Sequence, residues 1–319
     1  MSDFEIKNGV LKRYNGKDEN VVIPEGVTAI DEYAFYDCRK LKRVVIPAGV
    51  TEIGDSAFSW CRNLKSVTVP GSVTRIGVSA FSWCNSLKRL TIPKGVLEID
   101  ESAFDGCNSL TKITLPKGIT YIARKAFYGC IALTGIVIPK GVISIDDGAF
   151  MECWSLASVM IPSSVTTIGE NAFSNCRKLA NIAIPNGVTT IGAHAFANCW
   201  EITSVTIPES VTEIGGGAFC RCSKLESVTI EDGVKKIEAW AFSECKALTS
   251  INIPKSVTQM GRGAFGHLSN LETVTLPKAS KLIKNVELLG EALFGSTPKN
   301  FLTDEGCPIN FNSDIKRGV

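Results

Sequence analysis

Three regularities in this 319-residue sequence predict a solenoid, a fold in which short repeats stack in a line. Phenylalanine recurs every 23 residues from Phe35 to Phe265, and cysteine keeps the same step from Cys38 to Cys245. No insertion shifts this register. Proline marks it as well, at Pro24, Pro47, Pro70, Pro93, Pro116, Pro139, Pro162, Pro185, Pro208, Pro254 and Pro277. One repeat cannot bury its own apolar side, so about eleven repeats must cover one another.

The residues before each proline predict a short β-strand. In one representative repeat, Val44 and Ile46 occupy alternate positions, as the inward side of a strand requires. Pro47 then ends the strand, because it has no N–H group for a sheet ladder. Stacked repeats would place these strands in a parallel sheet with neighbours ~4.8 Å apart.

The second half of each repeat predicts a short helical or 3₁₀ segment opposite the sheet. Ala57, Cys61 and Leu64 are spaced as i, i+4 and i+7, which is one face of a helix. Asp55 or Ser56 would supply the capping side chain at its start.

The two ends depart from the repeat, as the caps of a solenoid should. Alternating apolar residues around Asn8 and Gly9 predict a hairpin, so residues 1–20 are interpreted as an N-terminal cap. Residues 21–277 form the repeats. Residues 281–294 have the pattern of an amphipathic helix, and residues 278–319 are interpreted as a C-terminal helical cap and tail.

The repeat resembles the BspA-type leucine-rich-repeat family over about residues 20–276. The landmarks that carry this resemblance recur at one spacing and are, in one repeat, Leu41, Val44, Ile46, Val50, Ile53, Ala57, Phe58, Cys61 and Leu64. The resemblance implies a right-handed, curved α/β solenoid with the strand array on its concave side. It also implies a bacterial or protist surface or adhesion protein that binds host proteins or other cells, although a fold alone does not fix a ligand.

Composition narrows the function further. A net charge of +2 is not the strongly basic footprint of a nucleic-acid binder. The polar amino terminus lacks the apolar core of a secretory signal, and no run approaches the ~18 apolar residues of a membrane span. The sequence as written therefore predicts a cytoplasmic protein without a membrane span, or a cell-surface or secreted one if it is a trimmed form of an exported protein.

Charge is shared unevenly along the chain. Residues 41–140 hold 13 Lys and Arg against 6 Asp and Glu, whereas residues 141–232 hold 4 against 10. This polarity either keeps solvated faces soluble, or steers a partner, or permits head-to-tail self-association of a protein expected to be a monomer.

The sequence offers no catalytic, cofactor or metal site, and we expect no enzyme. Ten of the twelve cysteines share one apolar repeat position, which predicts a ladder of buried, unpaired thiols. Cys220 breaks this pattern and is expected to be exposed, either inert or open to modification. His194 and His267 stand three repeats apart in different columns, too far apart for a shared nucleophilic or zinc site.

One repeated column is mostly threonine. Such a column either stacks between coils as β-branched residues do, or offers hydroxyls to a sugar or other surface. Its members are Thr28, Thr51, Thr74, Thr120, Thr166, Thr189, Thr212 and Thr258.

The variable columns give two candidate partner-binding sites, since the repeated positions are scaffold. The first is a basic cluster, expected on the concave strand face. It comprises Arg43, Arg89, Lys94, Lys112 and Lys117. The second is an aromatic group of Trp154, Arg177 and Trp200, in which Arg177 would lie over an indole ring. For both groups, the alternative is a purely structural or solvated role.

These observations predict a non-catalytic protein-interaction module, adhesin-like or scaffold-like, that binds a protein partner through the concave face. The competing hypothesis is a carbohydrate- or surface-binding module that uses exposed tryptophans and the threonine column.

Overall fold

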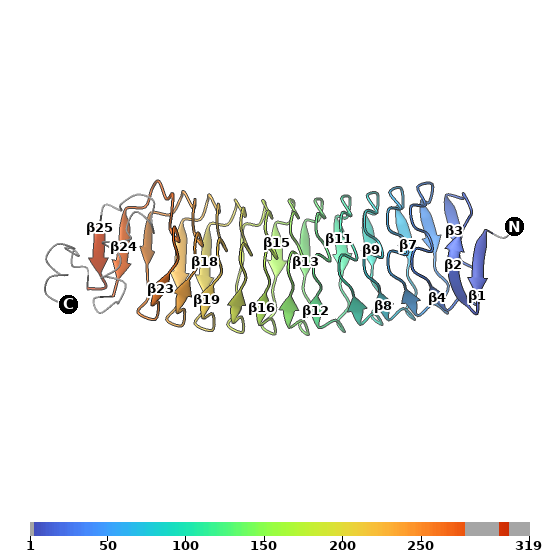
Figure 1. Cartoon of the computed structure of the whole chain (residues 1–319), viewed down its shortest axis with the longest axis horizontal. Helices are drawn as coiled ribbons and strands as arrows, with labels where there is room; N and C mark the ends of the chain where they lie inside the picture. Colours follow the sequence, from blue (N-terminus) through green and yellow to red (C-terminus); the bar gives the residue numbers. More distant parts are fainter. Residues whose placement is uncertain (1–2, 278–299, 306–319) are drawn as a thin grey trace. The chain divides into compact units, whose positions relative to one another are not determined.

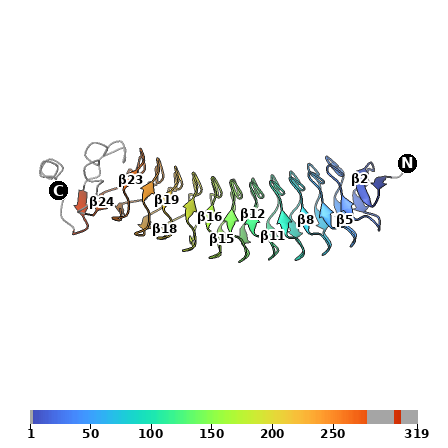
Figure 2. The same cartoon turned by 60° about the horizontal axis from the view of Figure 1, so that its bottom comes forward.

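The computed structural model describes residues 3–277 and 300–305. The chain divides into two compact units, Met1–Ser164 (unit 1) and Val165–Val319 (unit 2). Each unit is a stack of 23-residue coils whose strands belong to two ladders, seen as two rows of arrows in Figure 1 and from another side in Figure 2.

The first ladder of unit 1 contains the predicted strands, one before each repeated proline. Its strands are β3 (Asn20–Val22), β5 (Arg43–Val45), β7 (Ser66–Thr68), β9 (Arg89–Thr91), β11 (Lys112–Thr114), β13 (Gly135–Val137) and β15 (Ser158–Met160). They pair in parallel within three separate groups, β3–β5–β7, β9–β11 and β13–β15. In β5, β9 and β11 the middle residue is buried and the first residue is exposed, which confirms the predicted alternation.

A second ladder of two-residue strands follows the proline turn, and the sequence did not predict it. In unit 1 its strands are β4 (Ala29–Ile30), β6 (Glu52–Ile53), β8 (Arg75–Ile76), β10 (Glu98–Ile99), β12 (Tyr121–Ile122) and β14 (Ser144–Ile145). At its start β1 (Phe4–Lys7) and β2 (Val10–Tyr14) form an antiparallel hairpin, and β2 pairs in parallel with β4. The hairpin therefore covers the first coil of this ladder.

Unit 2 repeats the same two ladders. The strands of its first ladder are β18 (Ser204–Ile207), β20 (Ser227–Ile230), β22 (Ser250–Asn252), β24 (Thr273–Leu276) and β25 (Asn300–Thr303). Those of its second ladder are β16 (Thr167–Ile168), β17 (Thr190–Ile191), β19 (Glu213–Ile214), β21 (Lys236–Ile237) and β23 (Gln259–Met260). The paired strands are parallel throughout.

The segment expected to be helical is a chain of tight turns. Ser56 and Trp60 have positive φ angles of 53° and 64°, which interrupt any right-handed helix. Ala57 N–H donates to the carbonyl of Gly54 at 3.2 Å, whereas Ser56 N–H donates to the next coil, at Val78, at 2.7 Å. Among the described residues none is helical. The prediction of helical or 3₁₀ segments is therefore wrong. It arose because the buried residues of these turns recur at the spacing of one face of a helix.

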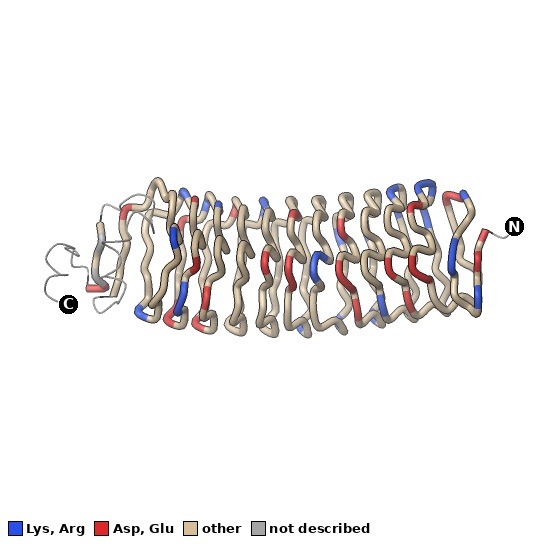
Figure 3. Tube along the Cα trace, viewed as in Figure 1, with Lys and Arg blue, Asp and Glu red and all other residues tan. Residues whose placement is uncertain are grey.

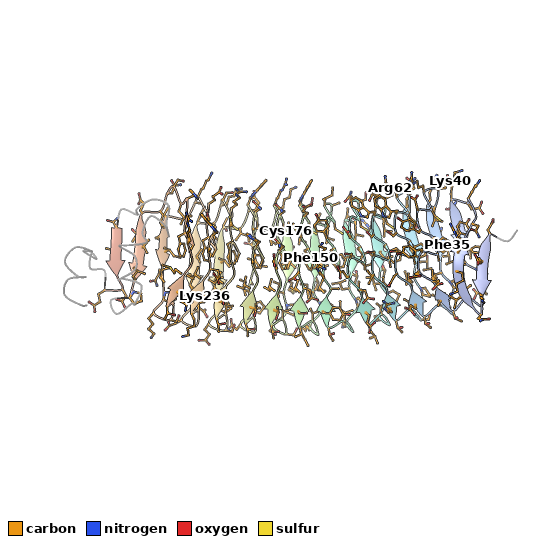
Figure 4. The ribbon with its side chains drawn as sticks, in the orientation of Figure 1. Phe35, Lys40, Arg62, Phe150, Cys176 and Lys236 are labelled. Atoms are coloured by element: carbon orange, nitrogen blue, oxygen red, sulfur yellow. The ribbon has the colours of Figure 1, made fainter. Side chains whose placement is uncertain are left out.

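The space between the ladders is filled by two internal columns. Phenylalanine rings stack with centroids 4.8–5.6 Å apart from Phe35 to Phe150 in unit 1 and 5.2–5.3 Å apart from Phe173 to Phe265 in unit 2. Figure 4 shows Phe35 and Phe150 inside the stack and Lys40 and Arg62 at its edge. The rings are fully buried, so they exclude water from the whole length of each stack.

The cysteine column lies beside these rings. Thiols of this column donate to the carbonyl of the phenylalanine 26 residues earlier, as Cys61 does to Phe35 at 3.0 Å and Cys245 does to Phe219 at 3.2 Å. The ladder thiols from Cys61 to Cys245 are buried and form no disulfides, which confirms the prediction for them, whereas Cys38 is only partly buried.

Other expectations concern the ends of the chain. The helix predicted over residues 281–294 lies outside the described residues, and the division into cap, repeats and tail remains a prediction. No helix among the described residues is long and apolar enough to cross a membrane.

Candidate functional site

The outward side of the first ladder in unit 1 carries three of the predicted binding residues. Arg43, Arg89 and Lys112 are the first residues of β5, β9 and β11, and all three are exposed. Lys112 and Arg89 are direct partners in the parallel register. Arg43 stands two coils earlier, where Ser66 is its partner on β7. The ladder thus brings Arg89 and Lys112 together and leaves Arg43 apart.

The other two predicted basic residues lie on turns rather than on the ladder. Lys94 and Lys117 directly follow the prolines of consecutive coils, and both are exposed. Lys94 is five residues after Arg89, at most about 17 Å along an extended chain. We call the five residues Arg43, Arg89, Lys94, Lys112 and Lys117 the basic face.

The charges of the basic face are not neutralised. Within the part of the chain that the structure describes, none of its five residues forms an ion pair with a carboxylate. Lys65 and Lys88, which the sequence analysis did not select, are also exposed and directly precede β7 and β9. The charged positions are mapped in Figure 3. Such an array attracts an acidic surface and speeds encounter with it.

In the second ladder of unit 1, by contrast, the cation Arg75 is neutralised by surrounding carboxylates. Arg75 on β8 lies 2.6 Å from Glu52 and 2.5 Å from Asp100, with Asp55 and Glu98 at 3.2 and 3.8 Å. Although partial burial opposes it, the carboxylates raise the pKa of Arg75. The four carboxylates around Arg75 therefore lie on or just after strands of the second ladder, whereas the strand residues of the basic face are on the first.

Sequence reasoning missed a hollow in the first ladder. It is an open depression of about 440 Å³ between β7 and β9, and its lining is Val67, Thr68, Val69, Gly71, Arg89, Thr91 and Pro93. The two strands belong to separate hydrogen-bonded groups at this point. A sequence signal existed: Val69 and Gly71 are smaller than Ile92 and Lys94 at the same positions of the next coil.

An apolar pair occupies the same ladder two coils further along. Val137 on β13 and Met160 on β15 are direct partners in the register and are 65% and 66% exposed. Solvent exposure of this size at two adjacent apolar side chains is typical of a contact surface rather than of a core.

Two of the three residues of the predicted aromatic group, Arg177 and Trp200, are in contact within unit 2. In unit 2 the guanidinium carbon of Arg177 lies 4.9 Å from the ring centroid of Trp200, so the expected cation–π contact is present. Trp200 is 42% exposed. Trp154 belongs to unit 1 and is 39% exposed.

The polar and aromatic columns considered for sugar binding are engaged within the protein. Thr51 Oγ1 donates to the carbonyl of Thr28 at 3.3 Å, and Thr189 Oγ1 does the same to Thr166 at 3.2 Å. Trp60 and Trp83 stack on each other at 5.2 Å. The threonine contacts favour the stacking interpretation of that column over a role in sugar binding.

The fully buried cysteines of the ladder are poor nucleophiles. Burial raises the pKa of Cys107 to about 12, which keeps this ladder thiol protonated near neutral pH. Cys220 is partly buried rather than exposed as predicted, and burial raises its pKa too. Among the described residues no group of three or more His, Cys, Asp and Glu is placed to hold a metal ion.

Comparison with known proteins identifies the family to which the repeat belongs. The chain matches the BspA type leucine rich repeat region, which contains six copies of the repeat, over residues 5–130, 97–226 and 189–298. No curated protein sequence shows a significant match.

Several solved structures are similar to this chain. A leucine rich cell surface protein from Faecalibacterium prausnitzii A2-165 is 30% identical, with a TM-score of 0.59 over 92% of this chain and 90% of that one. A leucine-rich repeat protein from Bacteroides ovatus is 27% identical, with a TM-score of 0.58 over 92% and 94%. The pneumococcal vaccine antigen PcpA shares the fold, at 20% identity and a TM-score of 0.57 over 90% and 79%. The expected cytoplasmic location gains no support from these proteins.

Proposed function

Since the chain belongs to the BspA-type leucine-rich-repeat family, we propose that it is a non-catalytic, adhesin-like module of the cell surface that binds a protein partner. Binding takes place through the outward side of the first ladder of unit 1. The observation that carries this proposal is the basic face, whose five cations are exposed and unpaired among the described residues.

The physical setting favours recognition by this surface. Arg43, Arg89 and Lys112 stand on hydrogen-bonded strands, so the backbone beneath them is already ordered before a partner binds. The cations attract an acidic partner over a distance of about one Debye length, and Val137 and Met160 offer apolar contact on the same ladder.

The test is a binding screen of purified proteins of different net charge, run beside an array of neutral and acidic glycans. We expect acidic proteins to bind, with affinity falling steeply between about 0.05 M and 0.5 M salt. The variant Arg89→Glu with Lys112→Glu should lower that affinity at least ~10-fold. The matched control is Ser204→Glu with Ser227→Glu, a register pair of the first ladder in unit 2, and it should bind as the wild type does.

The rival site is the aromatic group of Trp154, Arg177 and Trp200. Binding there would depend little on salt and would be lost in the variant Trp154→Ala with Trp200→Ala. Equal affinity in wild type and in the charge-reversed variant contradicts the basic face as the binding site. A stronger response from glycans than from proteins contradicts the choice of partner.

A further inference from the structure

The hollow between β7 and β9 is produced by small residues in one coil. Val69 stands where the neighbouring coils have Ile46 and Ile92, and Gly71 stands where they have Ala48 and Lys94. A Cβ atom added to Gly71 would meet no other atom within 4 Å, so space opens above this residue. The middle residue of β7, Val67, is correspondingly only partly buried, whereas those of β5 and β9 are buried.

The lining of the hollow joins a cation and two hydroxyls to an apolar floor. Arg89 supplies a guanidinium that pairs with no carboxylate among the described residues. Thr68 and Thr91 supply hydroxyl groups, and the rest of the lining is Val67, Val69, Gly71 and Pro93. A guanidinium can hold a carboxylate through two parallel hydrogen bonds, which no other side chain does as well.

The surroundings determine which carboxylate fits. Lys65, Lys88 and Lys112 are exposed beside the hollow and favour further negative charges next to the bound one. The apolar floor suits an aliphatic stem, and the exposed pair Val137 and Met160 suits apolar side chains of the same partner. A glycan carries its acid group on a hydroxyl-rich ring, which would leave this apolar surface without a complement.

We propose that the hollow is an anchor site for one glutamate side chain of an acidic protein segment, held by Arg89 with its methylene groups against Val67, Val69 and Pro93. This inference rests on the proposed function, since it names the chemistry that the partner presents to the basic face. It also predicts that filling the hollow abolishes the anchor while every charge is kept.

The probe is a fluorescent octaglutamate peptide, followed by anisotropy at low salt, with octaglutamine and a heparin oligosaccharide as comparisons. Arg89→Gln should raise the dissociation constant about 10- to 100-fold, because charge-assisted hydrogen bonds are lost. Arg43→Gln removes the same charge from the same column outside the hollow, and it should raise the constant only about 2- to 3-fold.

Gly71→Leu fills the hollow and leaves all charges in place. Its fold should be preserved, since Gly71 does not have a positive φ and the same position holds Ala48 and Lys94 in the adjacent coils; circular dichroism checks this. We expect the dissociation constant of octaglutamate to rise about 10-fold. Ala48→Leu enlarges the equivalent position of the preceding coil, outside the hollow, and should leave binding unchanged.

Two outcomes overturn the anchor. If Arg89→Gln and Arg43→Gln weaken octaglutamate binding equally while Gly71→Leu has no effect, the cations act only as a diffuse field. In that case the charge reversal of Arg89 and Lys112 would still weaken the binding of acidic proteins, and the proposed function would stand without the anchor. If the heparin oligosaccharide loses more affinity than octaglutamate in Arg89→Gln and Gly71→Leu, the hollow recognises an acidic glycan instead.

Discussion

In unit 1 the columns beside the first ladder include several basic residues, whereas in unit 2 the same repeat positions are neutral or acidic except at Lys255. The first residues of the ladder strands include Arg43, Arg89 and Lys112 in unit 1, but in unit 2 they are Ser204, Ser227, Ser250, Thr273 and Asn300. In unit 1 the position after the proline holds Lys94, Lys117 and Lys140 in three consecutive coils, and Glu25, Ala48, Gly71 and Ser163 in the others. In unit 2 it holds Asn186, Glu209, Asp232 and Lys255.

The interiors of the two units, by contrast, are nearly identical. Phe104 stacks between its neighbours at 5.6 and 5.5 Å, and Phe219 does so at 5.2 and 5.3 Å. Every coil fills the same inward positions, so outward side chains change without disturbing the packing. A repeat scaffold of this kind separates stability, which resides in the inward columns, from recognition, which resides in the outward ones.

The largest expected effects test whether the interiors are equivalent. Phe104→Ala and Phe219→Ala should each cost ~3–5 kcal/mol of stability, the usual loss for deleting a buried ring. Hydrogen exchange should show the opening concentrated in the substituted coil and its neighbours. Ser204→Ala, on an exposed ladder position, is the control and should change stability by less than about 0.5 kcal/mol. A cost that differs by more than about 2 kcal/mol between the two phenylalanines contradicts the shared interior.

Much of this architecture was predictable from the sequence. The 23-residue step and the alternation of Val44 and Ile46 correctly predicted the coils and the first ladder. Burial of the cysteine column followed from its single apolar register. These features could be predicted because each is set by local periodicity and repeated in every coil.

The turns, the second ladder and the hollow were not predictable in the same way. The positive φ angles at Ser56 and Trp60 could not be predicted from residue type, since neither residue is glycine. The hydrogen bond from Ser56 to Val78 joins different coils and has no local sequence signal. The hollow depends on two small residues in one coil, Val69 and Gly71, which resemble ordinary variation until the lining is seen together. Of the candidate site, the sequence therefore identified the cations and missed the space between them.

An intermediate effect concerns Asp105, a partly buried carboxylate that distinguishes unit 1. Burial raises the pKa of Asp105 to about 6, opposed by Lys125, and its Oδ1 atom has no hydrogen-bond partner among the described residues. At the same repeat position unit 2 has no charged side chain in its described coils: Ser174, Ala197, Cys220, Ser243 and Gly266. Because the folded pKa exceeds the unfolded value, Asp105 favours folding while protonated, and this contribution is lost as pH rises through about 6.

The corresponding measurement compares wild type with Asp105→Asn by urea unfolding from about pH 4 to pH 7. The stability of the wild type relative to the variant should fall by about 1 kcal/mol over this range, a value reduced for the partial exposure of the carboxylate. Ser243→Asp places a carboxylate at the equivalent position of unit 2 and should introduce a pH dependence of the same sign. A constant difference between wild type and Asp105→Asn across the range contradicts this role of Asp105.

The smallest expected effect leaves stability unchanged and concerns thiol reactivity. Each unit has one partly buried cysteine among its described residues, Cys38 in unit 1 and Cys220 in unit 2, while the other described thiols are buried. The neighbouring Cys61 side chain lowers the pKa of Cys38, whereas burial raises that of Cys220. Since the thiolate is the nucleophile, Cys38 should react faster than Cys220 with iodoacetamide near neutral pH.

Mass spectrometry of the labelled peptides, sampled over time and pH, measures this difference. Labelling of Cys38 should level off at a lower pH than labelling of Cys220, because its thiolate forms first. Cys38→Ser and Cys220→Ser each remove one labelled peptide and identify the two signals, while Cys107 should react only after unfolding because it is fully buried. If Cys107 reacts in the native protein as fast as Cys38, the coils open far more often than a stack of packed rings permits. If Cys220 reacts faster than Cys38, exposure outweighs thiolate formation, and the two units differ in access rather than in local electrostatics.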